Sequence, residues 1–251
     1  MIMDSNYNSG YNKGSYNFHY QKDNKLVAYS TESERAAFYR KTYTHVAFAI
    51  LAFILVETAL FRLIPPYFIE DMFAAPFIAF FEVGILLLGS FMATKWSHSL
   101  NKNTLYLGLG FYVLLEAIFF FPFIGAAVMM SYTEVLWQAV IITLSLFTGI
   151  TTVVFMTRLD FSFLRSVLII GGFLSLGLIV AGVLFGNDVG LWFSIGMVAF
   201  AAGSILYETY RIKNKYTTEQ YVGAALQLFA SVMVLFWYVL KILSRFPRGL
   251  R

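Results

Sequence analysis

Long apolar segments, each separated from the next by a short polar stretch, constrain the fold of this chain more than any other feature. A helix needs roughly 20 apolar residues to cross the hydrocarbon layer of a bilayer. Segments of that length lie at about 44–64, 74–94, 105–125, 135–156, 163–185, 191–210 and 221–243. Only 13% of the residues are charged, against about a quarter in soluble domains. The sequence therefore predicts an all-α integral membrane protein, a bundle of seven transmembrane helices.

The first 40 residues differ from the rest in being polar. Residues 5–12 alternate Asn, Ser and Gly with Tyr, a composition that builds no core. We therefore expect residues 1–40 to be a disordered cytoplasmic tail and residues 41–251 to be the transmembrane domain. A docking segment for a soluble partner is the alternative for the tail. Thr31 and Glu34 have the spacing of a capping box, which predicts a helix start there.

Basic residues fall in every second loop, and this bias orients a membrane protein because loops rich in Lys and Arg stay in the cytoplasm. The basic residues on one side are Arg35, Arg40, Lys41, Lys95, Lys102, Arg158, Arg165, Arg211, Lys213 and Lys215. The other loops hold Arg62 and several acids. We therefore expect a cytoplasmic amino terminus and an outside carboxy terminus. The basic tail around Arg245 opposes this orientation, and we expect the earlier loops to outweigh it.

Four carboxylates lie inside the apolar segments or at their edges: Glu57, Glu82, Glu116 and Glu208. Acids are costly in a membrane and are usually functional there. No Lys or Arg lies mid-segment to pair with them, and carboxylates with hydroxyl oxygens suit Ca²⁺. The alternative is structural. Each Glu would then be neutral and hydrogen-bonded to a neighbouring helix, and Glu208 would form an ion pair with Arg211 three residues on.

Enzyme functions fit the sequence poorly. The chain has no cysteine, and its three histidines, His19, His45 and His98, lie in the tail, at the start of the first segment and in a loop. None stands mid-membrane beside a serine, as an intramembrane serine protease requires. No His-Glu-x-x-His zinc motif is present. We therefore expect a protein without enzymatic activity.

Short motifs follow one another in a fixed order along the chain. The last two segments form a hairpin that contains Tyr207-Glu208, then Thr218-Glu219, then Ala225-Leu226-Gln227-Leu228-Phe229. Glu82-Val83, Glu116 with Pro122, and the segment from Asp160 to Leu164 precede them. This ordered set resembles the Bax inhibitor-one (transmembrane Bax inhibitor motif) family over about residues 40–245. The resemblance implies a seven-helix bundle with the carboxy-terminal helix packed centrally.

The resemblance also implies a site. In the family, an Asp of helix six faces an Asp of helix seven and forms a pH-sensitive latch on a calcium leak path. Here Glu208 takes the first position and Ser231 the second, so a coupled carboxylate pair is absent. The residues that we assign to an ion path or to proton sensing are Glu208, Glu82, Glu116 and Ser231. Arg211, Lys213 and Lys215 belong to the adjoining cytoplasmic loop.

Two functions of different classes remain open. The first is a cation or calcium leak path, in which Ca²⁺ is the transported ion and no cofactor is needed. The second is a non-conducting membrane regulator that binds a membrane protease or another membrane protein. The buried acids favour the first, and the neutral Ser231 favours the second. In both cases we expect the lipid bilayer, and not nucleic acid, as the surroundings, in a bacterial inner membrane.

Overall fold

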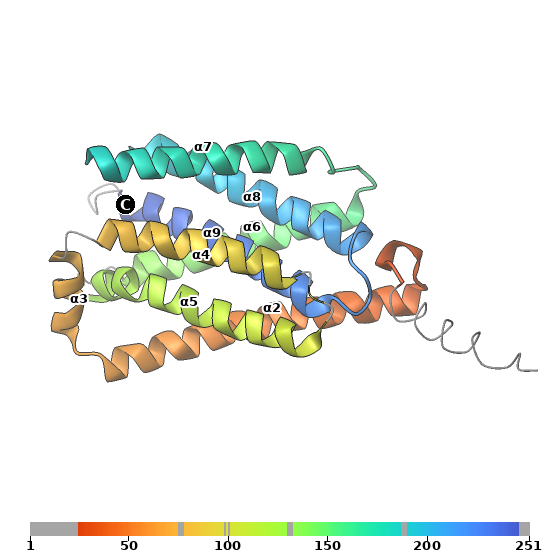
Figure 1. The fold of residues 1–251 in the computed structure, drawn as a ribbon, viewed down its shortest axis with the longest axis horizontal. Coiled ribbons are helices and arrows are strands. Elements are labelled where there is room, and N and C mark those ends of the chain that lie inside the picture. Colours follow the sequence, from red (N-terminus) through yellow and green to blue (C-terminus); the bar gives the residue numbers. More distant parts are fainter. Residues whose placement is uncertain are drawn as a thin grey trace, which may run out of the picture.

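The computed structural model describes residues 25–74, 78–97, 99, 101–129, 133–186 and 190–245. Within these ranges the chain is mainly helical, and its long helices run roughly along one common direction, whereas the short helix α3 lies across one end (Figure 1). The elements are η1 (Val27–Tyr29), α2 (Glu32–Leu63), α3 (Pro66–Ala74), α4 (Ile78–Ser97), α5 (Lys102–Met129), α6 (Thr133–Met156), α7 (Leu164–Phe185), α8 (Gly190–Asn214) and α9 (Tyr221–Ser244). The prediction of an all-α protein is confirmed for the described residues.

Six of the described helices are long and apolar enough to cross a bilayer, namely α2, α5, α6, α7, α8 and α9. The protein is therefore an integral, multi-pass membrane protein. The helix α4 lies beside them and coincides with the second predicted segment, and its charged residues are Glu82 and Lys95. Its 20 residues span about 30 Å at 1.5 Å per residue.

Helix α2 begins and ends where local sequence signals place its ends. The Thr31 side chain accepts a hydrogen bond from the Glu34 amide, and Glu34 accepts one from the Thr31 amide, which completes the predicted capping box. Pro65 follows the last residues of the helix, and Pro66 starts α3, a position where proline costs no hydrogen bond. The sequence did not predict α3, whose Ile69 is buried against α5 beside Gly125.

Helix α9 is enclosed on most sides, whereas α7 lies at the margin. Helix α9 contacts α2, α4, α5, α6 and α8, and its Ala224, Ala225 and Leu228 have no exposed surface. No residue of α7, which is described over its whole length, is buried. Helix α7 packs mainly against α8 and has a smaller contact with α4. Many of its apolar side chains therefore face the surroundings, which in a membrane are lipid.

The amino-terminal region requires a correction to the predicted boundary at residue 40. Residues 1–24 lie outside the described residues, but the chain is folded from Lys25 on. Leu26 forms an antiparallel bridge with Thr217, the Val27 amide donates to the Tyr216 carbonyl at 2.9 Å, and Val27 has no exposed surface. We call residues 25–30 the strap. It is ordered because Val27 gains a buried apolar site and its backbone gains partners in the α8–α9 loop.

The strap and the loops that carry the basic residues lie at one end of the bundle (Figure 1). The α6–α7 and α8–α9 loops and the starts of α2 and α5 are at this end, and α3 is at the other. We call the first the strap end.

Candidate functional site

Glu208 is held by a cation and a phenol at the strap end of α8. Its side chain is 8% exposed. Arg211 donates from Nη1 to both carboxylate oxygens, at 2.8 Å to Oε1 and 3.0 Å to Oε2. Tyr216, in the loop before α9, donates its hydroxyl to Oε2 at 3.4 Å. The ion pair that we considered from the spacing of three residues is therefore present, and a tyrosine completes it. We call Glu208, Arg211 and Tyr216 the Glu208 cluster.

Tyr216 links the Glu208 cluster to the strap. Burial raises the pKa of its phenol well above the usual range, so the hydroxyl keeps its proton and remains a hydrogen-bond donor. The Arg211 guanidinium carbon lies 4.9 Å from the centre of the Tyr216 ring, a cation–π distance. Because the Tyr216 carbonyl accepts from Val27, the strap fixes the backbone of a residue that contacts Glu208.

Ser231 forms hydrogen bonds with Ser204 and Gln227, and its relation to Glu208 stays a prediction. Its hydroxyl lies 2.8 Å from the Ser204 hydroxyl, and it donates to the Gln227 carbonyl at 3.1 Å. Ser204 precedes Glu208 by four residues and therefore lies one helical turn away. In the antiparallel pair of α8 and α9, Ser231 meets α8 one turn farther from the loop than Glu208.

Glu116 lies inside the bundle on α5, with 8% of its surface exposed. It lines a cavity of about 40 Å³ together with Tyr112, Phe119 and Trp237. Water needs about 10–15 Å³ of such volume per molecule, so the space admits a few waters and no hydrated ion. Glu116 therefore lies in the interior of the bundle, in a conformation that is closed around it.

The other two predicted acids have different outcomes. Glu82 lies in α4, but its side chain is outside what the structure describes. Glu57 is buried in α2, 5% exposed. Neither of its carboxylate oxygens has a hydrogen-bond partner among the described residues, so the hydrogen bond of the structural alternative is not found there.

The two lysines assigned to the α8–α9 loop differ in role. Lys213 lies in the last turn of α8 and donates from Nζ to the carbonyls of Val154, at 2.7 Å, and Thr157, at 3.1 Å. It therefore satisfies carbonyls at the end of α6, where a cation also suits the helix dipole. Lys215 is exposed. Its amide donates to the Arg211 carbonyl at 2.7 Å and closes the helix end.

Sequence reasoning missed Tyr216 and Ser204 as partners of the predicted residues. Ser204 could have been predicted from the sequence, because a polar residue four positions before Glu208 shares its helix face. Tyr216 carried no such signal, since a loop residue has no fixed period. Among the described residues, no group of three or more His, Cys, Asp or Glu side chains is arranged to hold a metal ion.

Comparison with known proteins matches most of the chain. The family model described as "Inhibitor of apoptosis-promoting Bax1" matches residues 35–248. Bax inhibitor 1 of Schizosaccharomyces pombe is 29% identical over 237 residues, which cover 89% of this chain and 82% of the relative. Protein lifeguard 4 of Mus musculus is 29% identical over 226 residues, which cover 87% of this chain and 89% of the relative.

Proposed function

Since this chain belongs to the Bax inhibitor-1 family, we propose that it is a cation leak protein, with Ca²⁺ as the first ion to test. The path runs beside Glu116 and is closed at the Glu208 cluster. Helix α4 makes a seventh crossing, α9 is the central helix, and the strap end faces the cytoplasm. The bacterial inner membrane stays a prediction, because the two relatives come from a yeast and a mouse.

One observation carries the proposal: the bundle holds Glu116 in its interior beside a small cavity. A carboxylate of this kind is expensive in a membrane and is seldom retained for packing alone. Carboxylate oxygens attract and coordinate hard cations such as Ca²⁺. The phenol of Tyr112, which also lines the cavity, adds a further oxygen one turn away on α5.

The Glu208 cluster supports a closed state at the strap end. The Glu208 carboxylate is paired with Arg211, so it does not offer its charge to an ion in this conformation. Opening then requires the carboxylate to leave the guanidinium, or the α8–α9 loop to move together with Tyr216. Because this charge is already neutralised by an arginine, we expect the pH dependence of flux to be weaker than in relatives with two aspartates.

Calcium flux into proteoliposomes tests the leak function. Glu116→Gln keeps the shape and removes the charge, so we expect flux to fall by about tenfold, equivalent to ~1.4 kcal/mol. Glu134→Gln is the matched control, because Glu134 is exposed in the first turn of α6, and it should leave flux unchanged. Equal flux in wild type and Glu116→Gln would show that Glu116 does not lie on the ion path.

A non-conducting regulator of another membrane protein is the second candidate. Ser231, at the position of the family's second Asp, is neutral and is hydrogen-bonded to Ser204. The family description names an inhibitor of another protein, which agrees with a regulatory role. Wild-type flux no greater than that of empty liposomes, with correctly folded protein, would favour this candidate over the leak.

A further inference from the structure

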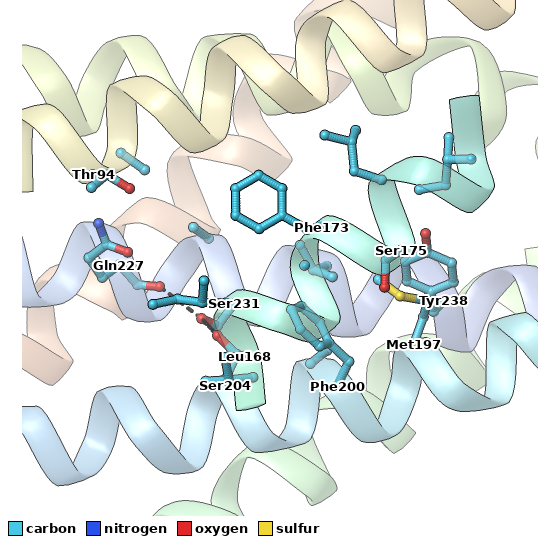
Figure 2. Close-up of a pocket in the computed structure, with 18 of the residues that line it drawn as sticks. Thr94, Leu168, Phe173, Ser175, Met197, Phe200, Ser204, Gln227, Ser231 and Tyr238 are labelled. Atoms are coloured by element: carbon cyan, nitrogen blue, oxygen red, sulfur yellow. Dashed lines mark hydrogen bonds between the residues drawn. The ribbon is translucent and has the colours of Figure 1, made fainter. Parts of the chain in front are cut away.

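A second, larger cavity lies between α7 and the rest of the bundle (Figure 2). Its volume is about 590 Å³, within the range of about 300–1,000 Å³ that is typical of ligand pockets. Residues of α4, α5, α7, α8 and α9 line it. It is separate from the small cavity at Glu116, with Tyr112, Val234 and Tyr238 lining both.

The cavity is open on the side of α7. Thr94 of α4 and Phe173 of α7 both line it, and both are exposed, Phe173 to 75%. Figure 2 shows the Phe173 ring standing between these two helices. Because α7 is an apolar helix long enough to cross a bilayer, the opening between α4 and α7 lies at the depth of lipid chains rather than in water.

The lining is suited to an apolar chain with a weakly polar end. Leu168, Phe173, Leu176 and Phe200 form much of the wall. Among the uncharged polar side chains, Thr94, Ser204, Gln227 and Ser231 lie toward one end, whereas Ser175 and Tyr238 lie toward the other (Figure 2). None of the described residues that line the cavity carries a formal charge.

We propose that this cavity binds an acyl chain of a bilayer lipid, which enters between α4 and α7. An empty apolar space of this size loses dispersion contacts along its walls, and lipid chains are the medium next to its opening. The polar end lies near the strap end, since Thr94 is three residues before Ser97, the last residue of α4, and Gln227 is in the second turn of α9. A lipid ester or hydroxyl group meets hydroxyl and amide partners there. The Gln227 amide is already oriented, because its Nε2 donates to Ser97 Oγ at 2.9 Å.

Two glycines of α7 offer a matched pair of variants. Gly172 lines the cavity, and a Cβ added there would have the Phe200 Cζ atom as its nearest neighbour, at 3.8 Å, an ordinary contact. Gly172→Phe therefore places a ring in the space without a backbone clash. Gly177 is outside the lining, and a Cβ there meets nothing within 4 Å. Gly177→Phe adds the same side chain to the same helix without filling the cavity.

The experiment uses the full chain in liposomes that contain a phosphatidylcholine with a diazirine in one acyl chain. After irradiation, mass spectrometry maps the labelled residues. Lipids around the protein label exposed positions such as Ile170, which is 69% exposed. Only a chain inside the cavity reaches Ala201 and Ser231, which are 1% and 7% exposed. We expect label at Ala201 and Ser231 in wild type and Gly177→Phe, and its loss in Gly172→Phe with Ile170 labelled as before.

Ser175→Phe is a second filling variant, because Ser175 lines the cavity three residues farther along α7, and it should also remove the inner label. Label confined to exposed positions in wild type overturns the proposal. So does inner label that survives both filling variants. The labelling pattern does not depend on ion flux. Failure of the lipid proposal and failure of the leak function can therefore be told apart.

Discussion

At the scale of single residues, the decisive feature is that Glu208 has its cation on its own helix. Arg211 follows by three residues and contacts both carboxylate oxygens, and Tyr216 adds a hydrogen bond from the loop. Both charged side chains are largely buried, at 8% and 16% exposed. A buried ion pair adds little net stability, but removal of one partner leaves a charge without compensation.

We therefore expect Arg211→Gln to lower the free energy of unfolding by about 3 kcal/mol, at the lower end of the range for broken buried pairs, because the cluster lies near the end of the bundle. The double variant Glu208→Gln with Arg211→Gln should recover much of this loss, since neither side chain then leaves a buried charge without a partner. Thermal unfolding of both variants in the same detergent measures the coupling. Equal stability of Arg211→Gln and wild type would show that the pair is solvated.

At the scale of elements, the least expected contact is that of the strap with the α8–α9 loop. The strap belongs to a segment that the sequence predicts to be a disordered polar tail. Val27 is completely buried, whereas Tyr29 in the same short helix is 75% exposed. The strap meets the loop through two backbone hydrogen bonds, from Val27 to the Tyr216 carbonyl and from Thr218 to the Lys25 carbonyl. The strap and the α8–α9 loop therefore form one unit.

Val27→Asp should detach the strap, because burial of a valine is worth about 1.5–3 kcal/mol and a buried charge reverses that gain. Hydrogen exchange of the Thr218 amide should then accelerate. Tyr29→Asp is the matched control and should leave exchange unchanged. If the leak proposal is correct, Val27→Asp also raises calcium flux. Unchanged Thr218 protection in Val27→Asp would contradict a stable strap.

The contact of α4 with α9 depends on one glycine. A Cβ at Gly223 would overlap the Ser97 carbonyl oxygen, so only glycine allows this approach of the two backbones. We expect Gly223→Ala to lower the melting temperature. Gly196→Ala should instead raise stability by about 0.5–1 kcal/mol, because a Cβ at Gly196 in α8 meets nothing within 4 Å and alanine favours helix. A neutral Gly223→Ala would mean that α4 shifts without cost.

At the scale of the whole molecule, the arrangement of the loops agrees with alternate crossings. The α6–α7 and α8–α9 loops lie at the strap end together with the starts of α2 and α5, and α3 covers the opposite end (Figure 1). The strap end carries Arg158, Arg165, Arg211, Lys213 and Lys215. The same loops thus share an end of the bundle and a positive charge.

Reporter fusions at Asn214 and Arg251 should therefore report opposite sides of the membrane, with Asn214 in the cytoplasm, because α9 lies between them. A fusion in the α2–α3 connection should report the outside. Reports from the cytoplasm at both Asn214 and Arg251 would mean that α9 does not cross.

The local sequence determined the helices and their ends. Runs of apolar residues with few charges predict membrane helices because a bilayer penalises any polar group that a helix leaves unsatisfied. The capping box at Thr31 and the pair Pro65-Pro66 marked the ends of α2 because these signals act within a few residues. The ion pair of Glu208 with Arg211 was also within reach, since three residues on a helix bring side chains together.

Only the tertiary structure decided which helix faces meet. The packing of α8 against α9 places the Ser231 hydroxyl beside that of Ser204, and no local pattern fixes which residues of two helices meet. Tyr216 reaches Glu208 from the α8–α9 loop, and Val27 reaches Tyr216 from the strap. The second contact joins two segments that are far apart in sequence. The cavity behind α7 likewise arises from five helices together. The hydropathy of a residue predicts whether it lies out of water. The packing of the whole bundle decides whether that residue then faces lipid, another helix or an internal cavity.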